Sequence, residues 1–269
     1  MRVADVWANH WMPEFFERYP PMQELYDRVG IADRSRLPAG ALVSEAASAG
    51  VERAIVSGSA IGDAEATNRE VAELCAADPV RLVPCASVDP RQGMRAVREL
   101  HRCVTEDGFV ALKLMPFFFD LPPNDRSYYP LYAACVELGI PVLVLTGHTA
   151  VLAPNETGRP QHLDDVALFF PELTIVAGHA GYPWTDELIG LAWKHERLFI
   201  DTSGHRPKHF PPQLVKFMSS YGKEKVLFGT GWPMLDPAVL LGDVEGLGLG
   251  DEATERFLWS NAASIWGWS

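Results

Sequence analysis

Eight short apolar segments, most of them followed by a helical pattern, recur along the chain and constrain its fold most strongly. They are rich in β-branched residues or leucine and are bounded by Gly, Pro, Asp or Asn, which is typical of buried parallel strands. Eight strands alternating with helices predict an α/β fold, a (β/α)8 barrel, with residues 1–269 forming a single domain. The segments are RVADV (2–6), RAIVSG (53–58), RLVPCASV (81–88), GFVALKLM (108–115), IPVLVLTG (140–147), LTIVAGH (173–179), RLFIDTS (197–203) and KVLFGTG (225–231).

The connection after the first strand is longer than the others. It contains MPEFFERYPPMQ (12–23), whose proline and aromatic content predicts a lid over the barrel mouth rather than a regular element. An irregular surface loop is the alternative interpretation.

Charge and composition exclude several classes of partner. The net charge of −12 and the pI of about 5.1 argue against binding to nucleic acid or to an anionic membrane surface. No apolar run approaches the roughly 20 residues needed to span a bilayer, and MRVADVWANH (1–10) lacks the apolar stretch of a signal peptide. None of the cysteines forms a C-x-x-C pair, so Cys75, Cys85, Cys103 and Cys135 are predicted to be buried, reduced thiols in a cytoplasmic protein.

In such a barrel the active site lies at the C-terminal ends of the strands. Polar groups are retained at six strand ends, which favours an enzyme over a non-catalytic barrel. The residues at the eight strand ends are Trp7, Asn9, His10, Ser57, Ser59, Ser87, Asp89, Lys113, Met115, Thr146, His148, His179, Tyr182, Asp201, Ser203, His205, Thr230 and Trp232.

Six segments resemble, in order and spacing, the amidohydrolase superfamily, in the branch called amidohydrolase-related or amidohydrolase 2. The resemblance implies a distorted (β/α)8 TIM barrel and a hydrolase or decarboxylase-like activity, usually metal-dependent. The segments are CASVDP (85–90), GFVALKLMPFF (108–118), DRSYYPLYAACVELGIPVLVLTGHT (125–149), LTIVAGHAGYPW (173–184), LFIDTSG (198–204) and KVLFGTGWPM (225–234).

The chain departs from this family at the positions that hold the metal. Four of the five ligand positions implied by the resemblance carry Trp7, Asn9, Leu145 and Gly231, and only His179 is kept. A catalytic Zn²⁺ generally needs three protein ligands, so we expect the inherited metal site to be lost and no cofactor to be bound.

Four residues are predicted to be catalytic. His179 is the predicted general acid or base, although an imidazole kept only for packing is the alternative. Lys113 is expected to point into the barrel and to form an ion pair with Asp201; an oxyanion donor and a Schiff-base amine are alternatives. Asp201 could instead orient His179, and His148 could turn inward after the fifth strand.

Six further residues are predicted to bind the substrate: Trp7, Asn9, His10, Arg159, Tyr182 and Trp232. A flat ring at Trp7 and an amide at Asn9 suit a planar or carbonyl-bearing molecule, unless Trp7 only fills the space of the lost metal. Arg159 could clamp a carboxylate or pair with Glu156. The HRPKHF loop (205–210) is interpreted as solvated, with a basic rim for an anionic substrate as the alternative.

These patterns predict a metal-independent hydrolase or lyase acting on a small carbonyl- or carboxylate-bearing molecule. Hydrolysis, decarboxylation, hydration and ring opening all remain open, and a homodimer is possible. Two alternatives are a non-catalytic barrel that binds a small molecule or a partner chain, and an enzyme with a relocated metal on His10, His148 and His179.

Overall fold

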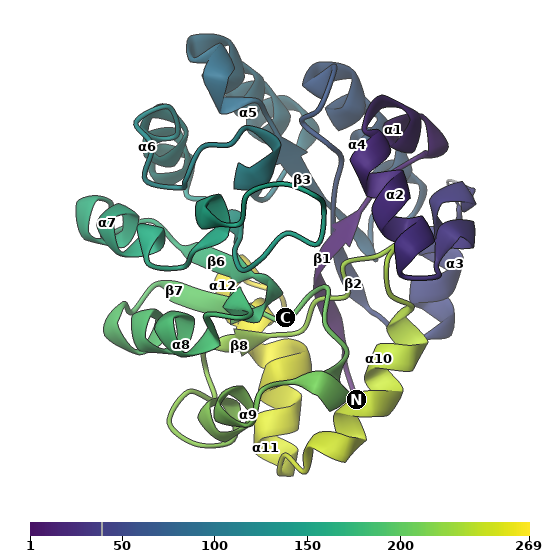
Figure 1. Ribbon diagram of the computed structural model, residues 1–269, viewed down its shortest axis with the longest axis vertical. Coiled ribbons are helices and arrows are strands. Elements are labelled where there is room, and N and C mark those ends of the chain that lie inside the picture. The colour runs from purple at the N-terminus through teal and green to yellow at the C-terminus, as the bar shows by residue number, and fades with distance from the viewer. Residues whose placement is uncertain (39) are drawn as a thin grey trace.

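The computed structural model describes residues 1–38 and 40–269. Eight parallel strands form one sheet in the order β1 to β8, and helices surround it (Figure 1). The strands are β1 (Ala4–Asn9), β2 (Arg53–Ser57), β3 (Leu82–Ser87), β4 (Leu112–Leu114), β5 (Val142–Leu145), β6 (Ile175–Gly178), β7 (Leu198–Asp201) and β8 (Val226–Leu227).

The sheet closes between its first and last strands. The Val6 N–H donates to the Phe228 carbonyl at 3.0 Å, and the Asn9 N–H donates to the Trp232 carbonyl at 2.9 Å. Seven of the observed strands lie within a predicted segment, and β1 overlaps the first segment (2–6) but continues to Asn9. The predicted TIM barrel is therefore confirmed.

The helices follow the strands in the order expected for such a barrel. They are α1 (Pro13–Arg18), α2 (Pro20–Arg28), α3 (Ala41–Ser48), α4 (Ala64–Ala77), α5 (Met94–Asp107), α6 (Tyr129–Leu138), α7 (His162–Phe169), α8 (Thr185–Lys194), α9 (Pro212–Ser219), α10 (Pro237–Val244), α11 (Asp251–Glu255) and α12 (Asn261–Trp266). Shorter helical turns are η1 (Ala32–Arg36), η2 (Pro90–Gln92), η3 (Pro116–Phe118), η4 (Glu156–Gly158), η5 (His179–Gly181), η6 (Pro207–His209), η7 (Glu245–Leu247) and η8 (Arg256–Ser260).

The segment after β1 is more regular than the sequence suggested. It forms helices α1 and α2, and both begin at a proline. Proline is favoured in the first turn because its missing N–H has no intrahelical partner there. The expectation of an irregular segment was therefore wrong.

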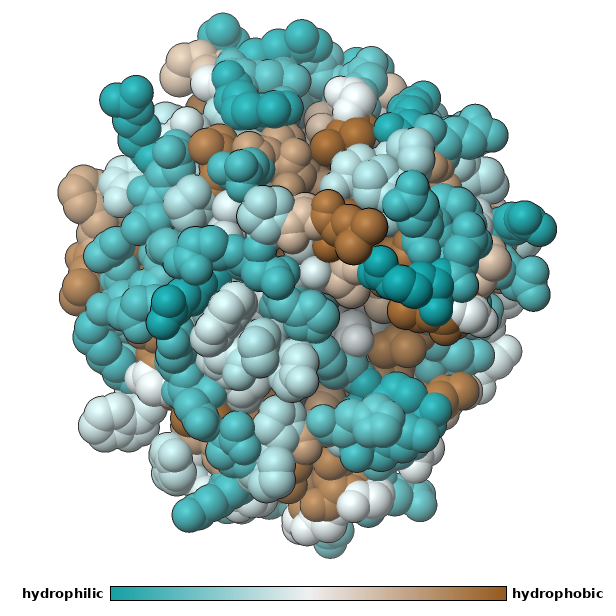
Figure 2. Space-filling model, viewed as in Figure 1, coloured by the Kyte–Doolittle hydropathy of each residue, from teal (hydrophilic) through white to brown (hydrophobic). Residues whose placement is uncertain are grey.

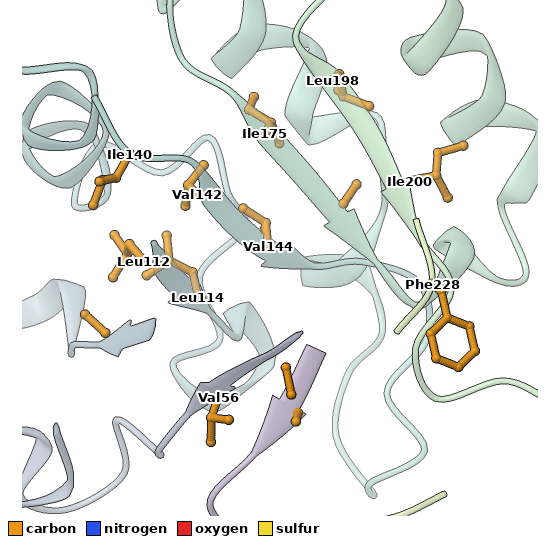
Figure 3. Packing of buried hydrophobic residues seen from close by; sticks show 14 of the residues in the cluster. Val56, Leu112, Leu114, Ile140, Val142, Val144, Ile175, Leu198, Ile200 and Phe228 are labelled. Atoms are coloured by element: carbon orange, nitrogen blue, oxygen red, sulfur yellow. The ribbon is translucent and has the colours of Figure 1, made fainter. Parts of the chain in front are cut away.

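Alternate strand residues face opposite sides of the sheet. Val142 and Val144 pack outward in one apolar cluster (Figure 3), whereas Leu143 and Leu145 belong to an interior cluster that also contains Trp7. The period of two along a strand explains this division. It also directs the side chains between the outward-facing residues, such as Lys113, into the barrel.

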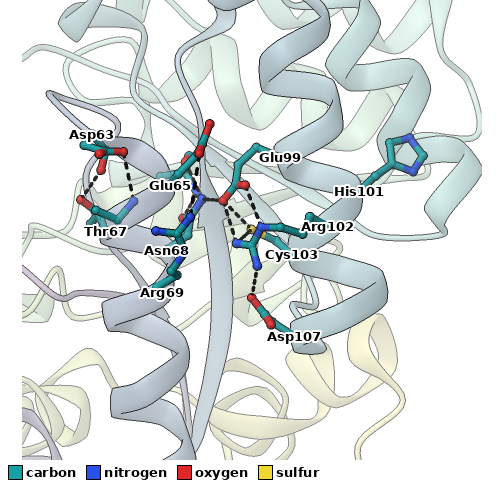
Figure 4. Close-up of polar contacts among 12 residues, drawn as sticks. Asp63, Glu65, Thr67, Asn68, Arg69, Glu99, His101, Arg102, Cys103 and Asp107 are labelled. Carbon is teal, nitrogen blue, oxygen red and sulfur yellow. Dashed lines mark hydrogen bonds and ion pairs between the residues drawn. The ribbon is translucent and has the colours of Figure 1, made fainter.

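A buried polar network fastens α4 and α5 to β3 (Figure 4). The Asn68 side chain donates to the Ser87 carbonyl at 3.1 Å and to Glu99 at 3.0 Å, and it accepts from the Ser87 N–H at 3.0 Å. Arg102 contacts both carboxylate oxygens of Glu99 at 2.9 Å. Burial raises the pKa of the adjoining Cys103 thiol, and all four cysteines are buried and free, as predicted.

The outer surface is mostly hydrophilic on the face shown in Figure 2, with separate hydrophobic patches between charged side chains. Within residues 1–38 and 40–269, none of the helices combines the length and the apolar character that crossing a membrane requires.

Candidate active site

A small pocket of about 90 Å³ lies at the barrel mouth, where the strands end. Most of its lining is apolar, and no lysine, arginine or carboxylate is among the described residues that line it. The apolar side chains include Trp11, Met22, Leu25, Met115, Phe117 and Met234, and the polar ones are His148, Thr149, His179 and His205.

Helix α2 covers this pocket. Met22 and Leu25 contribute to the lining, and the Arg28 guanidinium donates a hydrogen bond to the Ala150 carbonyl in the loop after β5. Trp11 and Phe15 stack with ring centroids 4.8 Å apart just before this helix. The segment between β1 and α2 therefore has the placement of the predicted lid.

An unusual turn presents His179 to the pocket. Strand β6 ends at Gly178, and the next two residues, His179 and Ala180, have φ values of 62° and 52°. Positive φ is uncommon for residues other than glycine and is often found at functional sites. A side chain at Gly204 would place its Cβ 2.8 Å from the His179 ring, so glycine there leaves room for the imidazole.

His179 connects to Asp201 through Ser203. The Ser203 Oγ lies 3.1 Å from His179 Nδ1 and donates a hydrogen bond to Asp201 Oδ2, while the Ser203 N–H donates to Asp201 Oδ1 at 3.1 Å. When Asp201 is ionised and takes the hydroxyl proton, the hydroxyl must accept from the imidazole, so Nδ1 carries the ring proton and Nε2 keeps its lone pair. The alternative interpretation of the sequence had Asp201 orienting His179, and the intervening hydroxyl was missed.

Burial governs the protonation of this chain of groups. It raises the pKa of the fully buried Asp201 carboxyl to about 7. It also holds the pKa of His179 well below its usual range, with a further contribution from His205, Lys113 and His148. At neutral pH the imidazole is therefore uncharged.

Lys113 lies beneath the pocket inside the barrel. Its ammonium donates to Asn9 Oδ1 at 2.5 Å and sits 4.3 Å from the centroid of the Trp7 ring. Burial lowers its pKa to about 7. Lys113 forms no salt bridge with Asp201, so the predicted ion pair is wrong, although Asp201 contributes electrostatically to the lysine pKa.

The positions of the family's metal ligands do not fit a metal ion in this chain. The Trp7 ring fills the space beside Gly178, where a Cβ would lie only 2.7 Å from it. The Asn9 oxygen is already bound to the Lys113 ammonium, whose charge would repel a divalent cation. At the two remaining positions, Leu145 and Gly231 offer no side-chain donor.

The alternative of a relocated metal on His10, His148 and His179 does not fit the structure. His10 lines a separate polar pocket with Glu14, Ser59 and Glu70, away from His148 and His179. Within the part of the chain that the structure describes, no three His, Cys, Asp or Glu side chains are grouped so that they could hold a metal ion.

Comparison with known proteins agrees with the fold. The sequence model of the amidohydrolase family, Amidohydrolase, matches residues 4–268. The chain belongs to the amidohydrolase family.

Relatives of this chain include decarboxylases. Gamma-resorcylate decarboxylase of Rhodococcus jostii is 28% identical over 228 residues, which cover 65% of this chain and 67% of that protein. An uncharacterized TIM-barrel protein of Bordetella bronchiseptica superposes with a TM-score of 0.81 at 23% identity, covering 100% of this chain and 99% of the other. A dihydroxybenzoic acid decarboxylase of Polaromonas sp., solved with manganese and 2-nitroresorcinol, has a TM-score of 0.73 at 19% identity, covering 99% and 96%.

Three other residues that were predicted to bind the substrate do not line the pocket: Trp232, Arg159 and Tyr182. The Trp232 indole donates to Glu45 at 2.9 Å toward the outer helices, and only its carbonyl approaches the interior, where it accepts from the Asn9 amide at 2.6 Å. Arg159 pairs with Glu187 at 2.9 Å rather than with Glu156.

Tyr182 lies at the rim of the site. It is 46% exposed, and its ring centroid is 5.6 Å from that of His148 and 5.5 Å from that of His205. Of the ten predicted residues only His148 and His179 line the pocket, while Trp7, Asn9, Lys113 and Asp201 lie buried inside the barrel.

His205 and Trp11 line the pocket but were not among the residues predicted to be catalytic or substrate-binding. His205 was assigned to a solvated loop, but it lines the pocket, and its ring centroid lies 6.4 Å from that of His179. Trp11 lines the other side, and its indole N–H has no hydrogen-bond partner. The position of His205 just after a strand end was a usable signal, and Trp11 followed the first strand in the same way.

His205 should make the fold sensitive to acid. Burial lowers its pKa to about 4 from the usual 6.5, so the unfolded state binds the proton more readily. We expect the contribution of His205 to the free energy of unfolding to be fully present above about pH 6.5 and to be lost as the pH falls to about 4. In His205→Gln the melting temperature should fall less between pH 7 and pH 5 than in the wild type, with His209→Gln, an exposed histidine of the same loop, as control. An unchanged slope in His205→Gln would contradict this assignment.

Proposed function

We propose that this amidohydrolase-family chain is a metal-independent lyase that removes CO₂ from a small aromatic carboxylate, with His179 as the general acid and base. The observation that carries the proposal is the neutral His179 imidazole, which lines an apolar pocket and is backed by Ser203 and Asp201. The decarboxylase names of the relatives support the choice of reaction.

The pocket suits a planar ring with oxygen substituents on one side. His148, His179 and His205 follow the adjacent strands β5, β6 and β7, whereas Trp11 follows β1 on the far side of the barrel. The ring of the substrate packs against the apolar side chains around Trp11, and its oxygen atoms face the imidazoles, which can both donate and accept hydrogen bonds.

The chemistry needs one proton at one carbon atom. The bond between the ring carbon and the carboxylate breaks, CO₂ leaves, and the electron pair stays on the ring carbon. That carbon takes a proton from His179 Nε2, so Nε2 must be protonated before this step. Lys113, held by Asn9 beneath the Trp7 ring, supplies a buried positive charge to the barrel interior.

Other features remain predictions from the sequence. The absence of a cofactor, a homodimer and a cytoplasmic location belong to this group, as do the substrate contacts of Asn9, Tyr182 and Arg159.

The reaction can be tested with 2,6-dihydroxybenzoate, the ligand class named for the related decarboxylases. Purified protein should release CO₂ and resorcinol, and in D₂O the product should carry one deuterium at the vacated carbon. His179→Ala serves as the matched negative control. If neither this compound nor a panel of hydroxybenzoates yields CO₂, the proposal is wrong.

A further inference from the structure

We propose that Ser203 relays a proton between Asp201 and His179, so that the buried Asp201 carboxyl stores the proton that His179 delivers. This inference rests on the proposed function and names the source of its proton. Ser203 is a positioning residue, because its hydroxyl reaches the pocket only through the imidazole.

The side chains of His179, Ser203 and Asp201 form a continuous hydrogen-bonded chain. Ser203 is fully buried, its Oγ is 3.1 Å from His179 Nδ1, and it hydrogen-bonds Asp201 Oδ2. The Asp201 carboxylate is held in place, because its other oxygen accepts a hydrogen bond from the Ser203 N–H. The same oxygen packs against Gly229 so closely that a Cβ there would lie only 2.0 Å away. A serine hydroxyl carries one donor and two acceptor sites, which suits a link between an acid and a base.

Two states of this chain differ by one proton. When Asp201 is ionised, Ser203 donates to it and accepts from Nδ1–H, so Nε2 faces the pocket as a base. When Asp201 is protonated, it donates to Ser203 and Ser203 donates to Nδ1, so Nε2–H faces the pocket as an acid. The imidazole stays neutral in both states, which fits the low pKa that burial gives it.

The proton transfer balances during decarboxylation. The ring carbon takes the proton from Nε2, Nδ1 takes the proton of the Ser203 hydroxyl, and Ser203 takes the proton of the Asp201 carboxyl. The products are CO₂, the protonated ring and an ionised Asp201. Water then returns one proton through the same chain. The raised pKa of Asp201, about 7, keeps both of its forms accessible near neutral pH.

Kinetics of single and double variants test the relay. We expect Ser203→Ala and Asp201→Asn each to lower kcat on the order of 100-fold with KM within threefold of the wild type. Because both break the same chain, the double variant should be no slower than the worse single variant. Thr202→Val is the matched control: it removes a neighbouring buried hydroxyl that donates to the Leu227 carbonyl, and its kcat should change less than twofold.

A spectroscopic readout tests the relay without turnover. In ¹⁵N-histidine-labelled protein at pH 9, where Asp201 is ionised, His179 should be protonated at Nδ1, and Ser203→Ala should lose this preference. Protonation at Nε2 in the wild type at pH 9 would overturn the relay, whether or not CO₂ release is found. If CO₂ is released but Ser203→Ala keeps kcat within threefold, the relay is wrong and the proposed function stands.

Discussion

Replacement of His179 by glutamine should lower kcat for CO₂ release by about 10²- to 10⁴-fold, the usual contribution of one placed general acid or base. Glutamine can still contact Ser203, but it cannot take up and release a proton near neutral pH. The effect should fall on kcat more than on KM, because the apolar part of the pocket is unchanged. The measurement is steady-state kinetics, with circular dichroism to confirm the fold.

A second histidine provides the control for this experiment. His162 hydrogen-bonds the Glu156 carbonyl at 3.1 Å and does not line the pocket, so His162→Gln should keep wild-type kinetics. If His179→Gln retained kcat within a few-fold of the wild type, the imidazole would only pack, and a non-catalytic binding barrel would become the better account.

Gly229→Ala should both destabilise the protein and remove its activity. A Cβ at position 229 would lie 2.0 Å from Asp201 Oδ1 and 3.1 Å from the Ser203 Cβ, and all three positions are tightly packed. Overpacking of a buried site costs about 1–3 kcal/mol, so the melting temperature should fall by several degrees. Any relaxation must move Asp201 or Ser203, so kcat should fall together with stability.

Gly190→Ala separates this clash from a general effect of losing a glycine. Gly190 lies in α8 with open space where its Cβ would point, and alanine is the better helix former by about 0.5–1 kcal/mol. This variant should be at least as stable as the wild type and fully active. Wild-type stability and activity in Gly229→Ala would show that the packing around Asp201 is looser than the structure indicates.

The fold was predictable because it depends on patterns that repeat. Each buried strand needs a run of apolar residues, and every run that the sequence showed became a strand of the barrel. The replacement of the family's metal ligands was also visible, because Trp7 and Gly231 offer no side-chain ligand whatever their surroundings. Both conclusions depend on residue type and order, which the sequence gives directly.

The partners of buried side chains were harder to predict. The alternation along β4 and β7 shows that Lys113 and Asp201 both point inward, but not whether their side chains meet inside the barrel. Lys113 instead reaches Asn9, and Asp201 meets Ser203, two residues further along the chain. Sequence position fixes the face of a strand, whereas contact across the barrel depends on tilt and side-chain length.

Loop residues were the least predictable part of the site. His205 follows a strand end, but nothing in HRPKHF shows that its ring reaches the pocket while His209 stays exposed. Similarly, Trp232 follows a strand end, yet its ring turns toward Glu45 on an outer helix. The path of a loop after a strand depends on packing that has no periodic signature.

The most direct test of this account is CO₂ release from 2,6-dihydroxybenzoate by protein that has been stripped of metal with a chelator and checked by elemental analysis. The account predicts that stripped protein keeps its full kcat and that added Mn²⁺ or Zn²⁺ does not raise it, because Trp7 and Asn9 stand at two of the family's ligand positions and both contact the Lys113 side chain. Loss of activity on stripping, with recovery on addition of one of these ions, would contradict it.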